Sequence, residues 1–199
     1  MSGRTLILET FWIGMASIGI CEQNELTVGV YNYAKVPENE LAHAQQEAAE
    51  VFGRAGIQIR WVACPVTHGC VERLRDCNRA LANGALYLNI LPEPMVARAR
   101  RPPSLMGVAL EDHASVFADR AQNVAGEKRI SPCVILGLAM AHEIGHLLLG
   151  PDHQAFGIMV KDLQLEQFRR AQQGIRPVFS TVQAQRMRAW LHGETPAKK

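Results

Sequence analysis

Residues 133–153 read CVILGLAMAHEIGHLLLGPDH, and this stretch decides which fold the chain can adopt. Up to residue 149 it is apolar almost all round, apart from three polar side chains, so a helix formed here must be buried in a core. Pro132 suits the first turn of such a helix. Gly150 accepts the left-handed backbone of a helix end, and Pro151 cannot continue the helix. We therefore predict one long buried helix over residues 133–149.

The three polar side chains of this helix form a chemical pattern. His142 and His146 are four residues apart, so their imidazoles lie on one helix face, about 5–6 Å apart at Cβ, and can share a cation. Glu143 follows the first histidine and points beside that cation, where a general base can take a proton from an activated water. Burying these groups without partners would be costly. We therefore predict one Zn²⁺ ion bound by His142 and His146, with Glu143 as the catalytic base.

A catalytic zinc ion needs a third protein ligand and one open position. The turn at Gly150 brings both Asp152 and His153 back toward the helix. His153 is the preferred third ligand, because imidazole is the commoner zinc ligand and the glycine position suggests a longer turn. Asp152 is the alternative. Glu166 is less favoured, because its neighbours are mostly charged residues and glutamines, as on a solvated helix face.

The residues from His142 to Met159 resemble the metzincin clan of zinc peptidases, whose signature is His-Glu-x-x-His-x-x-Gly-x-x-His followed by a methionine turn. Here Gly150 and His153 each come one residue later than in the signature, and Asp152 occupies the strict third-ligand place, as in snapalysin-like proteins. By this resemblance Gly150 and Met159 support the site structurally. The likeness to small uncharacterised bacterial metzincin-like proteins covers residues 26–159, including a Val-Tyr-Asn-Tyr strand and an Ala-Ser-Val-Phe segment.

The resemblance implies an α+β zincin or metzincin-like fold, with a mixed twisted sheet packed on two main helices and a C-terminal helical part. It also implies a zinc-dependent endopeptidase acting on a peptide or protein. Ser115, Val116 and Phe117 would then lie on the edge strand with which an extended substrate pairs. The alternative is a catalytically inactive zinc-containing binding or structural protein. The displaced third ligand favours that alternative, but Glu143 counts against it, because a structural site needs no base.

Hydrophobic patterns predict the remaining elements. Residues 64–84 should form a polar, cysteine-bearing connection, and residues 92–104, with four prolines, a surface loop without a helix. The predicted strands lie at residues 26–33, 57–62, 85–91, 106–110 and 114–118, and the other predicted helices at residues 38–54, 161–173 and 181–191.

Composition limits the class of protein. The chain has 199 residues, of which 48% are apolar and 20% charged, and a net charge of +2. These values fit one globular domain, predicted over residues 22–199, and give no reason to expect a nucleic-acid partner or a stable membrane insertion. They do not indicate an oligomeric state.

Residues 1–21 resemble a weak signal peptide, with one early arginine and an apolar run interrupted by Glu9. The run is short for a membrane-spanning helix, so we expect a secreted or periplasmic protein. The four cysteines beyond residue 21 would then form disulfides, and the sequence does not choose among their three possible pairings. They are Cys64, Cys70, Cys77 and Cys133.

Overall fold

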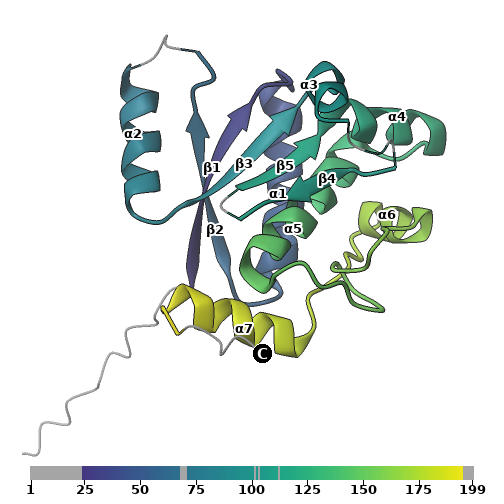
Figure 1. Ribbon diagram of the computed structural model, residues 1–199. Coiled ribbons are helices and arrows are strands. Elements are labelled where there is room, and N and C mark those ends of the chain that lie inside the picture. Colours follow the sequence, from purple (N-terminus) through teal and green to yellow (C-terminus); the bar gives the residue numbers. More distant parts are fainter. Residues whose placement is uncertain (1–23, 68–70, 101, 103, 112, 195–199) are drawn as a thin grey trace, which may run out of the picture.

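The computed structural model describes residues 24–67, 71–100, 102, 104–111 and 113–194 (Figure 1). The predicted signal peptide at residues 1–21 lies outside these residues. The elements in chain order are β1 (Glu25–Asn32), α1 (Glu38–Gly53), β2 (Gln58–Cys64), α2 (Val71–Ala82), β3 (Leu86–Leu91), α3 (Glu93–Arg98), β4 (Gly107–Ala109), β5 (His113–Phe117), α4 (Ala118–Lys128), α5 (Pro132–Leu149), α6 (Leu165–Gln172) and α7 (Thr181–Leu191).

The five strands form one mixed sheet in the order β2-β1-β3-β5-β4. The first four strands in this order are parallel, and β4 alone runs antiparallel to its neighbour β5. Helical crossovers connect the parallel strands β1 and β2 and the parallel strands β2 and β3. The predicted mixed sheet with packed helices is confirmed.

The predicted position of the edge strand is wrong. Ser115, Val116 and Phe117 belong to β5, which pairs with β3 on one side and β4 on the other. The free edge belongs to β4, which folds back on β5 as a hairpin closed by the Leu110 N–H donating to the His113 carbonyl at 2.8 Å. The sequence predicted both strands, but the resemblance placed the wrong one outermost, because the order of the two strands depends on the pairing of β5 with β3.

Helices α1 and α5 cover one face of the sheet and form the main core with it (Figure 1). They cross at Gly137, where an added Cβ would lie 2.5 Å from both the Ala44 carbonyl oxygen and Glu47 Cβ. The backbones can therefore approach closely only because residue 137 has no side chain. Both main helices predicted from the sequence are present, and α5 begins with Pro132 and ends before Gly150 as expected.

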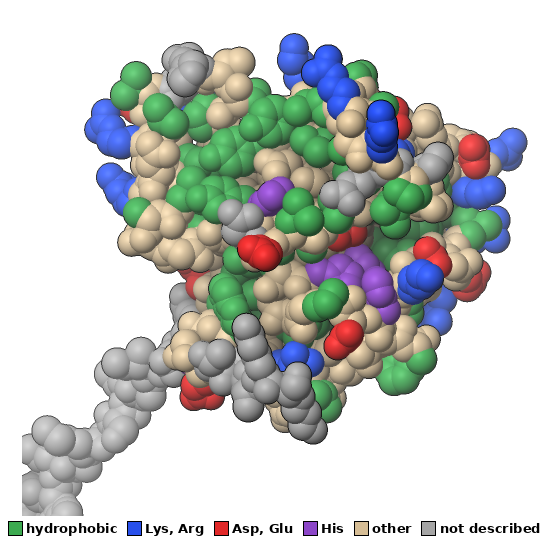
Figure 2. Space-filling view, viewed as in Figure 1, with side chains coloured by type: hydrophobic (Ala, Val, Ile, Leu, Met, Phe, Trp, Pro, Cys, Tyr) green, Lys and Arg blue, Asp and Glu red, His purple; other side chains and the backbone are tan. Residues whose placement is uncertain are grey.

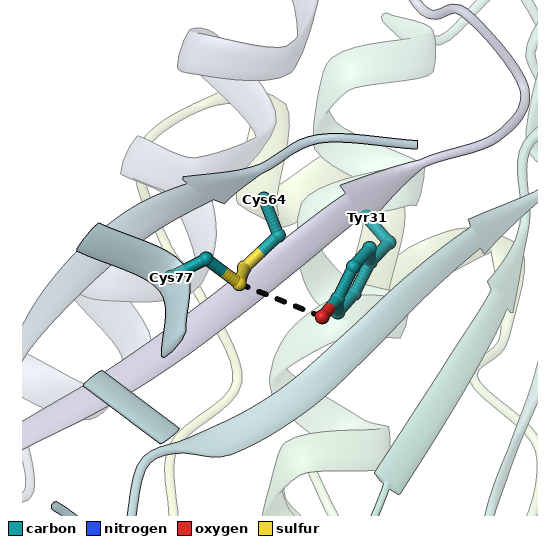
Figure 3. The surroundings of a disulfide bond; sticks show 3 residues. All are labelled: Tyr31, Cys64 and Cys77. Atoms are coloured by element: carbon teal, nitrogen blue, oxygen red, sulfur yellow. Dashed lines mark hydrogen bonds between the residues drawn. A yellow bond between two sulfur atoms is a disulfide. The ribbon is translucent and has the colours of Figure 1, made fainter. Parts of the chain in front are cut away.

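Helix α2 packs on the opposite face of the sheet, beside β2 and β1, and a disulfide joins Cys77 to Cys64 (Figure 3). The Tyr31 hydroxyl lies 3.5 Å from Cys77 Sγ and donates to it. The sequence predicted a polar, cysteine-bearing connection here and did not predict the helix within it. Among its twelve residues α2 buries only Cys77 and Ala80, so its sequence carries little hydrophobic signal. Of the described cysteines, Cys133 forms no disulfide.

Two further helices were not predicted. Helix α3 lies within the proline-rich stretch, where Pro92 precedes the helix and Pro94 occupies its first turn, a position that needs no N–H donor. Helix α4 contains the buried Arg120, whose Nε donates to Glu93 at 3.0 Å and whose Nη1 donates to the Leu105 carbonyl at 2.8 Å. Arg120 thereby fixes the segment that leads into β4.

The C-terminal part contains α6 and α7, as predicted, and is tied to α1 by an ion-pair cluster. Arg176 makes a bidentate contact with Glu47 at 2.7 and 2.9 Å and reaches Glu50 at 2.8 Å. The Ser180 side chain caps α7 by accepting from the Gln183 N–H at 3.2 Å.

Within the described part of the chain, α5 is the one helix long and apolar enough to cross a membrane, judged by length and composition. Of its eighteen residues, 78% are buried inside the protein, as expected for a core helix.

The disulfide generates a prediction for stability. Cys64 and Cys77 are 13 residues apart, and cross-linking such a loop lowers the entropy of the unfolded chain. Replacing both by serine should lower the free energy of unfolding by about 3 kcal/mol in urea denaturation. Cys133→Ser is the control and should have little effect. An unchanged midpoint in the double variant would contradict this account of how α2 is held.

Candidate metal centre

Three histidines from two segments meet at one place. His142 and His146 lie on α5, and His153 lies in the loop after it; their candidate ligand atoms are all within 4.8 Å of one another. Figure 2 shows histidine side chains gathered together at the surface, with acidic side chains nearby. His142 is 8% exposed, His146 partly buried and His153 exposed.

The structure thus brings together the two predicted helical ligands and the preferred third candidate. Asp152 and Glu166 are exposed and lie outside the cluster found among the described residues. The geometry therefore favours His153 over both alternatives.

Backbone carbonyls fix the orientation of the two helical imidazoles. The Nδ1 of His142 lies 2.9 Å from the Ile158 carbonyl oxygen, and the Nδ1 of His146 lies 2.9 Å from the Gly150 carbonyl oxygen. A carbonyl can only accept, so each Nδ1 carries the proton and donates. Each Nε2 of a neutral ring then presents a lone pair.

These two Nε2 atoms are 3.0 Å apart, which brings two lone pairs together without a proton between them. A shared cation relieves this repulsion. Tetrahedral zinc with Zn–N distances of about 2.0–2.1 Å keeps its nitrogen ligands about 3.3 Å apart, so the observed spacing needs only a small adjustment. The residues present therefore fit a zinc ion.

The pKa values of the two helical histidines agree with this assignment. Burial lowers the pKa of His142 to about 4, although the hydrogen bond to the Ile158 carbonyl opposes the shift. Burial also lowers the pKa of His146, against the hydrogen bond to Gly150. Both imidazoles are therefore neutral near pH 7, which is the form that binds metal.

The loop after α5 owes its path to Gly150. This residue has φ 92° and ψ −175°, a backbone region that is essentially closed to side-chain-bearing residues. The chain then turns back, and the Gln154 N–H donates to the Met159 carbonyl at 2.7 Å. This turn brings His153 to the cluster and the Ile158 carbonyl to His142.

Met159 is fully buried and packs against α5 at Gly145. Its Sδ lies 2.6 Å from the position that a Cβ on Gly145 would occupy, and the Phe179 ring lies 3.0 Å from the same point. Because Gly145 has no side chain, Met159 can pack directly against the helix.

Glu143 is 7% exposed and lies between α5 and the edge strand β4. Burial raises the pKa of its carboxyl to about 8 in the metal-free protein. A nearby cation would favour the ionised form and lower that pKa. Glu143 thus combines a raised pKa with a position next to His142 on the same helix, which makes it a candidate acid–base residue.

Several parts of this centre could not be read from the sequence. The carbonyls of Ile158 and Gly150 are backbone groups, and Gly107 contributes by lacking a side chain. The only sequence signals are Gly150 itself and the glycine that opens the short apolar run at residues 107–110.

Neither the models of known protein families nor the sequences of curated proteins match this chain. Among solved structures, the fold is similar to a zinc-dependent peptidase from Methanocorpusculum labreanum (strain Z), with a TM-score of 0.52 and 17% sequence identity. The match covers 80% of this chain and 99% of that chain. At this identity the likeness establishes a shared fold, here a peptidase-like one.

The pKa of Glu143 predicts how the metal-free protein responds to pH. Its folded pKa of about 8 lies above the ordinary value of 4.5, so the folded state holds a proton that the unfolded chain releases. Stability is therefore lost as the pH rises from about 4.5 to about 8. Glu143→Gln removes this loss, so the variant should exceed the wild type in stability at pH 8 by a few kcal/mol and by much less at pH 4.5.

The measurement is urea denaturation of chelator-treated protein at several pH values. The depressed pKa of His142 gives the opposite slope between about pH 4 and 6.5, but it is common to both proteins and cancels in the difference. A difference between variant and wild type that does not grow with pH would contradict a buried, proton-holding Glu143.

Proposed function

We propose that this chain is a zinc-dependent endopeptidase that hydrolyses peptide bonds with Glu143 as general base. The observation that carries the proposal is the convergence of His142, His146 and His153, with the two helical Nε2 atoms facing each other and the buried carboxyl group of Glu143 next to His142 in the same helix. The shared fold with a zinc-dependent peptidase supports it.

Each residue has a defined task in this proposal. The three histidines would hold one zinc ion, which would supply Lewis-acid polarisation of the scissile carbonyl and a more acidic water molecule. Glu143 accepts a proton from the attacking water at its carboxylate and then delivers it to the leaving amine. The Ile158 and Gly150 carbonyls hold the imidazole rings in their metal-binding tautomers.

An extended peptide would bind along the free edge of β4. Among the described residues no further strand pairs with β4 on that side, and Gly107 on β4 lies against Glu143. Pairing a peptide with β4 by backbone hydrogen bonds would lay one of its carbonyls beside the base. In this proposal the substrate therefore pairs with Gly107–Ala109 of β4 and not with Ser115, Val116 and Phe117 of β5.

We further propose that the protein is metzincin-like, with Met159 as the hydrophobic support beneath the ligands and Gly150 as the turn of the signature. The disulfide between Cys64 and Cys77 favours an oxidising compartment, in agreement with a secreted or periplasmic protein. The competing function is a zinc-containing binding protein without activity, and catalysis by the purified protein distinguishes the two.

The proposal predicts separate losses of metal and activity. Glu143→Gln should keep one zinc per chain and lose casein cleavage by at least about 100-fold, because only the proton transfer is removed. His142→Ala and His146→Ala should lose both zinc and activity. Zinc content by elemental analysis and casein hydrolysis are the measurements. Substantial cleavage by Glu143→Gln would refute this mechanism.

The third ligand can be tested independently of activity. His153→Ala should lower zinc content or weaken zinc affinity by at least about tenfold, whereas Asp152→Ala and Glu166→Ala should leave both unchanged. Zinc titration against a competing chelator measures the affinity. Loss of zinc from the Glu166 variant, with retention in the His153 variant, would reverse the assignment.

A further inference from the structure

We propose that Gly107 on β4 is the positioning residue of Glu143, so that the edge strand itself fixes the base. The proposal rests on the proposed function and adds a residue to it. An added Cβ at position 107 would lie 2.6 Å from Glu143 Cγ, 2.8 Å from Glu143 Oε1 and 2.7 Å from the Ser115 carbonyl oxygen. The side chain of Glu143 and the Ser115 carbonyl oxygen thus together fill the space that any other residue at position 107 would need.

The requirement for glycine here is one of space. Gly107 does not have a positive φ, so its backbone conformation is open to other residues. Glycine is required at position 107 because the β4 backbone approaches α5 closely there. With the helix on one side and the strand on the other, the carboxyl of Glu143 has few rotamers left to it.

The strand cannot easily move away to admit a larger side chain. Gly107 pairs with Val116 of β5, which is itself fixed by β3 on its other side. Just before β4, the guanidinium of Arg120 donates to the carbonyls of Pro102 and Leu105 at 2.5 and 2.8 Å. Two of the three close contacts are with the Glu143 side chain, which can move, and the third is with the Ser115 carbonyl oxygen of the β5 backbone. A methyl group at position 107 should therefore displace Glu143 and also disturb the pairing of β4 with β5 locally.

This arrangement links substrate binding to the base. A peptide paired with the outer edge of β4 is held by the same short strand whose backbone positions Glu143. The distance between the scissile carbonyl and the carboxylate is then set within one rigid unit. Gly107 acts through Glu143 and does not itself touch the reacting atoms.

The test is Gly107→Ala compared with wild type in zinc content, kcat, KM and unfolding. A displacement of about 1 Å can cost about 100-fold in rate, so we expect kcat to fall by about 10- to 100-fold. Zinc content should stay at one per chain, because the histidines are unaltered, and KM should change by a smaller factor than kcat. Full zinc with an unchanged kcat would overturn the positioning role and leave the proposed function standing.

Two glycines provide matched controls. An added Cβ on Gly126 in α4 meets nothing within 4 Å, so Gly126→Ala should leave both activity and stability near wild type. Gly137→Ala introduces an equally close contact at the crossing of α1 and α5. It should lower the unfolding midpoint without a selective loss of kcat in the zinc-loaded protein. A fall in kcat in Gly137→Ala equal to that in Gly107→Ala would reduce the effect to general destabilisation and overturn the proposal.

A second measurement does not depend on activity. The loss of stability caused by Gly107→Ala should be smaller in a Glu143→Ala background, because the two side chains then no longer compete for one space. The same loss in both backgrounds would overturn the contact. If the single variant fails to fold and the double variant folds, the competition is shown directly.

A wild type that cleaves nothing overturns the proposed function, and the positioning role with it, before any variant is compared.

Discussion

The centre depends on two hydrogen bonds from imidazole Nδ1 groups to backbone carbonyls. They set the tautomers of His142 and His146 and turn both Nε2 lone pairs toward one point. Both carbonyls, from Gly150 and Ile158, belong to the turn that follows α5. That turn needs the unusual backbone of Gly150, and Met159 beneath the helix completes it. The helix, the turn and the core thus act together to bring these imidazoles to one point where a cation could bind.

The sequence predicted α5, its two histidines and its glutamate because an almost entirely apolar helix makes any polar residue conspicuous. The sequence did not predict the elements whose formation or position depends on tertiary packing or strand pairing. Helix α2 buries too little to show a pattern, and α4 buries a charged residue, Arg120, through hydrogen bonds with distant segments. The order of β5 and β4 at the sheet edge is likewise a tertiary property, so the position of the edge strand was assigned wrongly.

At Glu143, the stability of the fold conflicts with the proposed role of the carboxyl group as general base. Burial of an ionisable carboxyl opposes folding at neutral pH, as its raised pKa records. The metal-free fold keeps the group because α1, α5 and the sheet supply a large apolar core around it. A bound cation would turn the unfavourable group into a favourable one, so folding stability and metal affinity are thermodynamically linked.

The uneven burial of the three histidines has a consequence for metal exchange. His142 is enclosed in the core and His153 is exposed, so the site has a deep side and a solvent side. If a metal ion binds here as proposed, an ion arriving from solution would meet the loop histidine first and would leave by release from His153. The rates of uptake and loss would then depend on the loop after Gly150, while the equilibrium affinity would depend on all three imidazoles.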